Sequence, residues 1–359
     1  MPSEKDTVKQ DQGEIIALKA KSLIIFLTAG SIWASSWTFD CKHDEKIDPN
    51  LRQAIWNKSL VLINSIQRNE PTVLMSMLIN EVRQAPDWRD EVIKAYKRFK
   101  PLVDGRDFKM YTQCHIVSDG SGKYQFNVPS NTREQFIIQA QRMSRETYIC
   151  FLASEKYYFD YMISVVYSRI GNEWQVQRVH IGLVRISGMS SYGWYTEAQR
   201  LYEQGHEAMS YLDLEISRLL LRPSPFMQYP IEKEIIEVFD KFTAQVHGKI
   251  YVRFAHLPTR PKLYNFSAHF IKARMVPKVT YITTLSLENE TGLRTEARAM
   301  TEAVETQFGG LGEDSNSISF TAYTDIPSDP NKTYACKEFD IKYESKPRSG
   351  PVIMAQNEK

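Results

Sequence analysis

The feature that most constrains the fold is a pair of long alternating segments joined by a tight turn. Aromatic and aliphatic side chains occupy every second position from Tyr157 to Tyr167, and an alternation resumes at Trp174 after the turn Gly171-Asn172-Glu173. A period of two is that of a β-strand, because successive side chains point to opposite faces of a sheet. A short turn between such segments favours an antiparallel hairpin. On its last strand, the side chains expected to share one face are Trp174, Val176, Arg178 and His180.

Three helices are predicted ahead of this hairpin. Asp48-Pro49 is a start signal, because Asp caps a helix and Pro fits its first turn. Similar signals begin a second helix at Glu70-Pro71, with apolar residues through Val82, and a third at Pro86-Asp87. From Phe108 on, the apolar period changes to two. This change predicts a hairpin of strands on either side of a turn at 119–122, followed by strands at 136–143 and 147–153.

Helices followed by a long-stranded antiparallel sheet that ends in a hairpin is the element order of the nuclear transport factor two-like superfamily. Residues 48–186 resemble this superfamily in that order and in the segment YYFDYMISVVYSRIGNEWQVQRVHIG. The resemblance implies an α+β domain in which helices pack on a curved antiparallel sheet and leave a cone-shaped pocket. Some members of the superfamily are isomerases, dehydratases or hydrolases, and many others only bind ligands or protein partners.

The candidate pocket residues come from the two strands of the hairpin. They are Tyr158, Asp160, Met162, Arg178 and His180. In an apolar pocket the pKa of Asp160 would rise, so that its carboxylate serves as a base, and His180 could pass on a proton. We favour the alternative in which Asp160 lies on a solvated face beside Ser164 and Ser168. No dyad or triad of a particular enzyme class is present, so Asp160 and His180 remain candidates only.

Residues 190–223 are predicted to form a helical hairpin. Its first amphipathic helix ends at Gly205, and its second ends before Pro223. The A-x-x-L-Y…G…P spacing is similar to that of a tetratricopeptide helix pair. Repeat arrays need about three units to bury their faces, and one pair is visible, so a packed appendage or a brace between domains is favoured over a peptide groove. The candidate contacts with a partner are Trp194, Tyr195 and Tyr202.

A second, smaller α+β domain is predicted at 230–344. It follows the proline-containing segments Pro223-Ser224-Pro225 and Tyr229-Pro230, which interrupt regular structure. Its expected order is a helix from Ile231, strands at 249–255, 267–275 and 278–287, a helix at 291–308, and strands at 317–324 and 334–343. Residues 345–359 contain Lys, Pro, Ser and Gly and are expected to form a flexible tail.

Residues 1–40 are expected to form a polar lead and a signal-like or anchor segment. Lysines precede an apolar run at 23–33, and small residues follow at 34–36, which is the order of a secretory signal. The run is short for a membrane span. Cys41 invites lipid attachment, but Asp40 stands where a lipobox requires a small residue. We therefore expect export to a bacterial periplasm or cell envelope, with a possible membrane tether, and keep a buried cytoplasmic helix as the alternative.

Composition and spacing argue against several classes of site. With 45 basic and 43 acidic residues, the net charge is +2. Such a nearly neutral chain has no strong overall electrostatic attraction to nucleic acid, so no nucleic-acid partner is expected. No two cysteines form a C-x-x-C pair and the histidines lack a tight ligand spacing, so no metal and no cofactor are expected. Cys114 and Cys150 are expected as buried thiols in strands, or as a bridge if the chain is exported.

Three functions remain open on the sequence. The first, which we favour, is a non-enzymatic envelope protein that binds a small ligand or a protein partner through the cone-like domain and the hairpin. The second is a small-molecule enzyme that uses Asp160 or His180 as a proton carrier. The third is a cytosolic interaction scaffold, which requires an exposed apolar groove at Trp194, Leu212 and Ile216.

Overall fold

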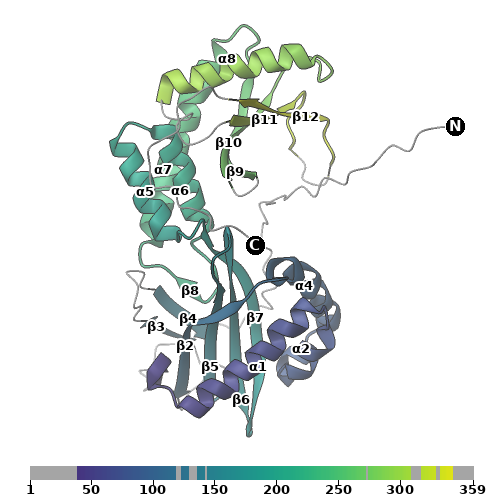
Figure 1. Cartoon of the computed structure of the whole chain (residues 1–359), viewed down its shortest axis with the longest axis vertical. Coiled ribbons are helices and arrows are strands. Elements are labelled where there is room, and N and C mark those ends of the chain that lie inside the picture. The colour runs from purple at the N-terminus through teal and green to yellow at the C-terminus, as the bar shows by residue number, and fades with distance from the viewer. Residues whose placement is uncertain are drawn as a thin grey trace, which may run out of the picture. The chain divides into compact units, whose positions relative to one another are not determined.

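The predicted α+β class is confirmed by the computed structural model, in which helices pack on a curved antiparallel sheet (Figure 1). The structure describes residues 39–118, 123–128, 136–141, 144–271, 274–308, 317–328 and 332–342. Its contacts form two compact units. We call the described part of Ile25–Arg200 together with Asp213–Lys241 the front unit, and the described part of Leu201–Leu212 and Phe242–Lys359 the rear unit. The predicted domain bounds stay a prediction, and the signal-like run at 23–33 and the tail lie outside the described residues.

Two antiparallel sheets make up the β-structure of the front unit. The main sheet has the order β1-β2-β5-β6-β7, with strands Phe39–His43, Phe108–Ser118, Glu146–Ser154, Phe159–Ile170 and Glu173–Ile186. The small sheet has the order β3-β4-β8, with strands Lys123–Val128, Phe136–Gln141 and Met227–Gln228. The predicted turn at Gly171 joins β6 to β7, whose pairing begins at Ile170 and Glu173. The long hairpin is therefore confirmed.

The predicted pairing of the strand at 123–128 with the preceding strand is wrong. β3 pairs with β4, whereas β2 pairs with β5 on one side and β1 on the other. The edge of β2 that a returning strand would use is occupied by β1, a strand that the sequence analysis did not predict. The predicted turn at 119–122 lies outside the described residues.

Helix α1 (Pro49–Gln67) begins at its predicted signal. The Asp48 carboxylate accepts hydrogen bonds from the backbone N–H of Asn50 at 2.9 Å and of Leu51 at 3.0 Å. These bonds satisfy two of the donors that a helix start leaves without a partner. A short 3-10 turn, η1 (Asp44–Lys46), connects β1 to this helix. The third predicted helix is also confirmed, as α4 (Trp88–Val103).

The second predicted helix is two helices, α2 (Pro71–Met77) and α3 (Asn80–Arg83). The chain becomes extended at Leu78, where ψ is 146°. Leu78 forms a β-bridge with Val176 of β7, and the Ile79 N–H donates to the Val176 carbonyl at 3.1 Å. Pairing with the sheet has therefore replaced one turn of the helix that the apolar spacing predicted.

The core of the front unit lies between these helices and one face of the main sheet, which α1 crosses (Figure 1). Fully buried side chains of this core include Ile55, Leu62, Tyr148, Ile163, Val165 and Tyr167. Each such side chain contributes about 1.5–3 kcal/mol when it leaves water, and this burial holds the helices. Buried hydroxyls here have partners, because Ser59 Oγ lies 2.9 Å from Tyr167 Oη and Ser65 Oγ lies 2.7 Å from Tyr96 Oη.

A β-bulge in β7 makes the predicted face of its residues wrong. The register between β6 and β7 shifts at Val166 and Tyr167, whose partners are Arg178 and Val176. Two residues of β7 therefore stand opposite a single step of β6, and the alternation reverses. Val176, with Trp174, packs against the helix-facing core. Arg178 and His180 instead lie on the opposite face of the main sheet.

Three helices contribute to both units, because the division between the units falls within each of them. They are α5 (Ser191–Glu203), α6 (Glu207–Leu219) and α7 (Glu232–Ala255), and the first two are the predicted helical hairpin. The strand predicted at 249–255 is wrong, since α7 continues to Ala255. Val246, Ile250 and Phe254 are fully buried at a spacing of four residues, which is the spacing of a helix face.

The rear unit is built on a mixed four-stranded sheet of order β12-β11-β10-β9. Its strands in chain order are Lys262–Ile271, Arg274–Ile282, Ser317–Tyr323 and Cys336–Lys342. β10 and β11 are parallel, and helix α8 (Glu290–Phe308) lies between them in the chain. Parallel strands need such a crossover connection. Within the described ranges, no helix is long and apolar enough to cross a membrane.

Candidate functional site

Three polar side chains lie together on the face of the main sheet that is turned away from α1–α4. Ser164 of β6 is directly opposite His180 of β7, and Arg178 is the next residue on the same face of β7. Directly opposed residues have Cβ atoms about 4.5–5.5 Å apart, so these side chains are neighbours. We call Ser164, Arg178 and His180 the polar cluster. Two of its members, Arg178 and His180, were predicted pocket residues, and Ser164 was not.

Ser164 is fully buried, and its hydroxyl has no hydrogen-bond partner in the described part of the chain. The hydroxyl of Thr147, on the same face of β5, is in the same situation. Buried polar groups without partners are few in native proteins, because each costs roughly 1–3 kcal/mol. Ser164 therefore marks a place where a further polar group would be favourable, and Thr147, which is opposite Ser168, marks a second place farther along the sheet.

Arg178 is a half-buried cation. Its guanidinium carbon lies 5.3 Å from the centroid of the Phe226 ring, and burial lowers its pKa. No carboxylate of the described residues lies within ion-pair distance of Arg178. A guanidinium stays charged in proteins, so an anion bound between Arg178 and Ser164 would be energetically favourable.

His180 is neutral at ordinary pH. Burial, together with the smaller effect of the positive charge of Arg98, lowers its pKa to about 4. The neutral imidazole has one donor and one acceptor nitrogen. The local field at the polar cluster is therefore positive, from two arginines, without any charge on the histidine itself.

A layer of chain covers this face of the sheet. Phe136 of β4 packs edge-on against Phe151 of β5, with ring centroids 6.0 Å apart. The segment before β8 approaches so closely that a Cβ on Gly182 would lie 2.3 Å from the Pro223 carbonyl oxygen. With Phe226 over Arg178, these contacts keep the polar cluster away from bulk water.

Asp160 is not part of the polar cluster. It lies four residues before Ser164 on β6, which is roughly 13 Å along a strand. Its carboxylate accepts hydrogen bonds from the Tyr157 N–H at 3.2 Å and from Ser154 Oγ at 3.5 Å, and burial raises its pKa. The expectation that Asp160 and Ser164 lie on a solvated face is wrong, because both are buried. Asp160 supports the connection between β5 and β6.

The two remaining predicted pocket residues, Met162 and Tyr158, make contacts that hold the fold together. Met162 is fully buried opposite Gly182, between Asp160 and the polar cluster. Tyr158 precedes β6, and its carbonyl accepts a hydrogen bond from the Ser187 N–H at 2.7 Å. Of the five predicted pocket residues, the structure thus brings together only Arg178 and His180 as polar neighbours on this face.

The predicted partner contacts on the helical hairpin are mostly buried. Trp194 is 7% exposed and its indole N–H donates to the Ile186 carbonyl, while Tyr195 donates to Glu234 at 2.6 Å. Tyr202 is 52% exposed and is the member of this set that a partner can reach. The scaffold hypothesis required exposed Trp194, Leu212 and Ile216, and all three are buried. These residues therefore offer no exposed apolar groove.

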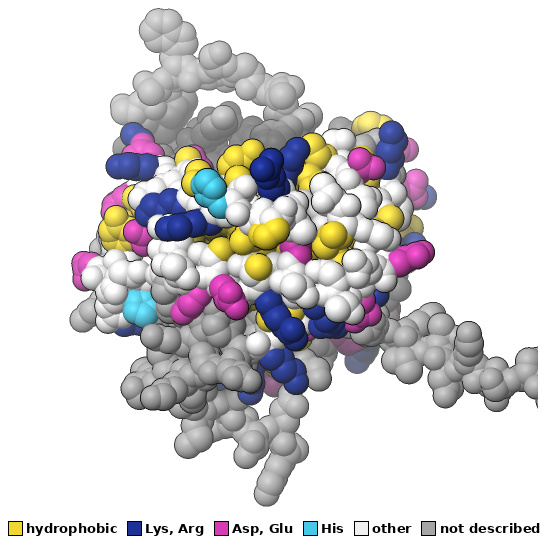
Figure 2. Space-filling model, turned by 90° about the horizontal axis from the view of Figure 1, so that it is seen from above, with side chains coloured by type: hydrophobic (Ala, Val, Ile, Leu, Met, Phe, Trp, Pro, Cys, Tyr) yellow, Lys and Arg dark blue, Asp and Glu magenta, His cyan; other side chains and the backbone are white. Residues whose placement is uncertain are grey.

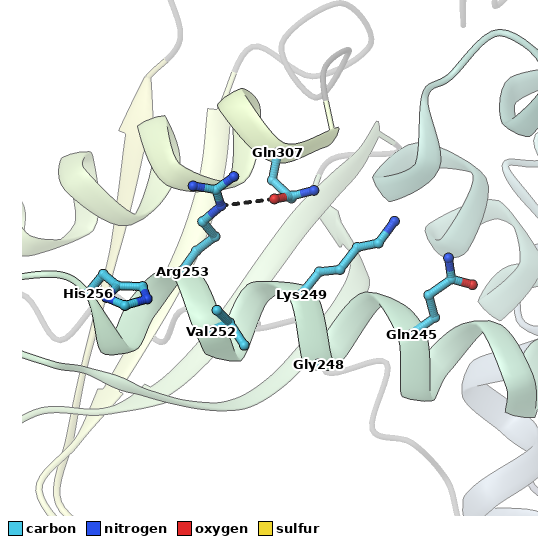
Figure 3. A pocket seen from close by; sticks show the side chains of 7 residues that line it. All are labelled: Gln245, Gly248, Lys249, Val252, Arg253, His256 and Gln307. Carbon is cyan, nitrogen blue, oxygen red and sulfur yellow. Dashed lines mark hydrogen bonds between the residues drawn. The ribbon is translucent and has the colours of Figure 1, made fainter.

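An open groove of about 490 Å³ lies along α7 in the rear unit (Figure 3). Its lining residues are Gln245, Gly248, Lys249, Val252, Arg253, His256 and Gln307. Arg253 and Gln307 point toward each other and share a hydrogen bond of 2.9 Å, and Lys249 forms an ion pair with Glu207. The groove was missed because 249–255 was predicted as a strand, although polar residues at 245, 249 and 253 recur at helical spacing.

The surface charges do not separate by sign on the face shown in Figure 2, where acidic and basic side chains are interspersed. Among the described residues, no group of three or more His, Cys, Asp or Glu side chains could hold a metal ion.

Comparison of the chain with models of known protein families, with curated proteins and with solved structures gave no match.

Proposed function

We propose that this protein is a non-enzymatic binding protein of a bacterial cell envelope, and that its front unit binds a small anionic ligand at the polar cluster. The observation that carries the proposal is a half-buried arginine beside a buried hydroxyl, neither of which has a partner (an acidic one, for the arginine) among the residues that the structure describes. Pockets of binding proteins are mostly apolar with a few convergent polar groups, and this face of the sheet has that character.

Each member of the cluster has a place in binding an anion. The planar guanidinium of Arg178 suits a carboxylate or a phosphate, which it can contact through two parallel hydrogen bonds. The Ser164 hydroxyl can donate to the same anion. The neutral His180 can donate from one ring nitrogen or accept at the other. The Phe226 ring next to Arg178 provides an apolar surface for the carbon skeleton of the ligand.

Binding is favoured over catalysis by the surroundings of the two candidate proton carriers. Asp160 is held by Tyr157 and Ser154, away from His180 along the strand. His180, with a pKa of about 4, is a weak base near neutral pH, where general bases work best with a pKa close to the ambient pH. The front unit thus lacks a matched acid and base at the polar cluster, as far as its described residues go.

The envelope location is the second part of the proposal. It rests on the lysines and the apolar run at 23–33, which precede the small residues at 34–36. Fractionation of cells that express the tagged chain tests it. Recovery with periplasm or membranes is expected, and recovery in the cytoplasm alone would remove the envelope from the proposal.

A ligand screen tests the binding part. The Tm of the full chain is measured with acetate, succinate, citrate, inorganic phosphate and glycerol phosphate in turn. The affinity of any anion that raises Tm is then measured by titration calorimetry. At least one of these anions should raise Tm. Arg178→Gln should then weaken its binding by roughly tenfold or more, and Ser164→Ala by less, because the charged contact is stronger than the neutral one.

Arg169→Gln is the matched control. Arg169 is an exposed arginine of the same sheet, paired with Glu146 at 3.0 Å, and its loss should leave anion binding unchanged. Circular dichroism of each variant establishes that it is folded. The proposal is overturned if no anion of the panel stabilises the chain, or if folded Arg178→Gln binds as well as the unaltered protein.

A further inference from the structure

A second cluster of reactive side chains lies at the opposite edge of the main sheet, where β1 pairs with β2. His43 of β1 is directly opposite Cys114 of β2, and Cys41 is two residues before His43 on the same face. The His43 ring bridges the two sulfurs, with Nε2 3.3 Å from Cys41 Sγ and Nδ1 3.2 Å from Cys114 Sγ. We call Cys41, His43 and Cys114 the thiol cluster.

The two thiols differ in access and in acidity. Cys41 is partly exposed on the edge strand β1, whereas Cys114 is fully buried. The neighbouring Cys114 thiol and the hydrogen bond with His43 lower the pKa of Cys41 to about 6, and burial raises the pKa of Cys114. Cys41 is therefore largely a thiolate at neutral pH, which is the form that reacts, and Cys114 is a protonated neighbour.

We propose that Cys41 and Cys114 form a redox-active pair, which small disulfides oxidise to an intramolecular disulfide with Cys41 as the site of attack. The proposal does not depend on the ligand site. Cys41 is the only one of the two sulfurs that a molecule from solution can reach, and the His43 ring holds the Cys114 sulfur nearby to complete the exchange.

The exchange has two steps. The Cys41 thiolate attacks one sulfur of a small disulfide, a mixed disulfide forms at Cys41, and the other half leaves as a thiolate that takes up a proton from solvent. The Cys114 thiol then gives its proton to His43, and its sulfur attacks Cys41 Sγ. The Cys41–Cys114 bond forms, the mixed disulfide breaks, and the second small thiol leaves with the proton. Two protein thiols are oxidised, and one small disulfide is reduced to two thiols.

The geometry requires only a local change. Cys41 and Cys114 are diagonal neighbours across the strand pair, a relation in which Cα atoms are about 7–8 Å apart, and a disulfide needs less than about 7 Å. Among the strands that the structure describes, β1 is at the edge of the sheet and pairs with β2 alone. It can therefore move toward β2 without repacking a second neighbour.

Other roles for these residues fit less well. The thiol cluster does not have the arrangement of a metal site, because no group of three or more His, Cys, Asp or Glu side chains among the described residues could hold a metal ion. Lipid attachment needs a terminal cysteine after cleavage, whereas Cys41 lies inside β1, paired with Ile116. The two remaining cysteines offer comparisons, because Cys150 is fully buried beside Ser59 and Cys336 is exposed in the rear unit.

Oxidised glutathione is the probe. The reduced full chain is incubated with mixtures of reduced and oxidised glutathione at pH 7, free thiols are trapped with iodoacetamide, and peptides are identified by mass spectrometry. A bond between the peptides of Cys41 and Cys114 is expected, with Cys150 still alkylatable after unfolding. Cys114→Ala should stop at the mixed disulfide of Cys41 with glutathione, and Cys41→Ser should give neither product.

The pH dependence of alkylation separates a reactive pair from buried thiols that happen to be close. Cys41 should react with iodoacetamide with a midpoint near pH 6. The midpoint should rise in His43→Gln and rise further in Cys114→Ala, because the neighbouring Cys114 thiol is the largest cause of the low pKa of Cys41. Cys336→Ser, the control, should change neither the midpoint nor the disulfide.

Two results would overturn the proposal. One is a Cys41 alkylation profile that neither His43→Gln nor Cys114→Ala shifts while both variants remain folded. The other is oxidation that yields only disulfides between chains, or mixed disulfides in the unaltered protein that never resolve to the Cys41–Cys114 bond.

Discussion

The most strongly perturbed histidine described above, His180, links the candidate site to the stability of the fold. Its pKa is about 4 in the folded chain and ordinarily 6.5. Between these values the unfolded chain binds the proton and the folded chain does not, so the free energy of unfolding falls as the pH is lowered through this window. The stabilisation from neutral His180 is present above pH 6.5 and is lost toward pH 4.

We therefore expect His180→Gln to flatten the pH dependence of stability. The difference in unfolding free energy between the protein and the variant should change by roughly 2–3 kcal/mol from pH 7 to pH 4. Urea unfolding at several pH values measures it. Thr147→Ala, a buried change on the same face without a titrating group, should differ from the protein by an amount that does not vary with pH. Parallel curves for His180→Gln would contradict the assigned burial.

Gly182 shows how closely the covering segment approaches the site. A Cβ there would lie 2.3 Å from the backbone oxygen of Pro223, so Gly182→Ala forces the backbone apart and should cost about 1–3 kcal/mol. Gly248→Ala is the opposite case, since nothing lies within 4 Å of its added Cβ inside α7. That change should stabilise by about 0.5–1 kcal/mol. Chemical denaturation compares the two, and equal signs would refute the packing argument.

At the scale of the elements, capping residues and apolar spacing predicted a helix or strand correctly where the tertiary contacts favour the same element. The capped start of α1 and the alternation of β6 and β7 were both visible in the sequence. The bulge opposite Val166 left a signal that was not used, because the apolar positions change from Trp174 and Val176 to Val179 and Ile181, with two successive polar residues between them. For α7, the aromatic and branched residues near 251 favoured a strand, while burial of every fourth residue decided for a helix.

The cap of α1 gives a prediction at the same scale. Asp48→Ala removes the acceptor of two backbone N–H groups and should lower the unfolding free energy by about 1 kcal/mol. Glu70→Ala is its control, because Glu70 precedes α2 without a side-chain capping bond. It should change stability by less than about 0.5 kcal/mol. Thermal unfolding of both variants tests the pair, and a similar loss for each would show that the cap is not the cause.

At the scale of the whole chain, the sequence predicted the fold class and the candidate residues Arg178 and His180, but not what surrounds them. The surroundings of Ser164 depend on how the successive strands β5, β6 and β7 align, and on the layer that covers their outer face. The thiol cluster was missed for a related reason, since it exists only because β1 pairs with β2. Spacing within a segment carries no information about such contacts.

The division into two units also goes beyond local signals, because it falls within α5, α6 and α7. Each unit nevertheless has its own β-structure and its own buried side chains, such as Ile163 in the main sheet of the front unit and Phe320 in the sheet of the rear unit. If each core holds mainly its own unit, a cavity in one should loosen that unit first.

Ile163→Ala and Phe320→Ala test this reciprocally. Their expected costs are about 2–5 and 3–5 kcal/mol, from lost burial and the cavity left behind. Hydrogen exchange read by mass spectrometry should show faster exchange of β5 and β6 in Ile163→Ala, with β10 and β11 less affected, and the reverse in Phe320→Ala. Each variant serves as the control for the other. Equal acceleration of both sheets in either variant would mean that the chain opens as one cooperative unit, because helices shared by both transmit the loss of either core.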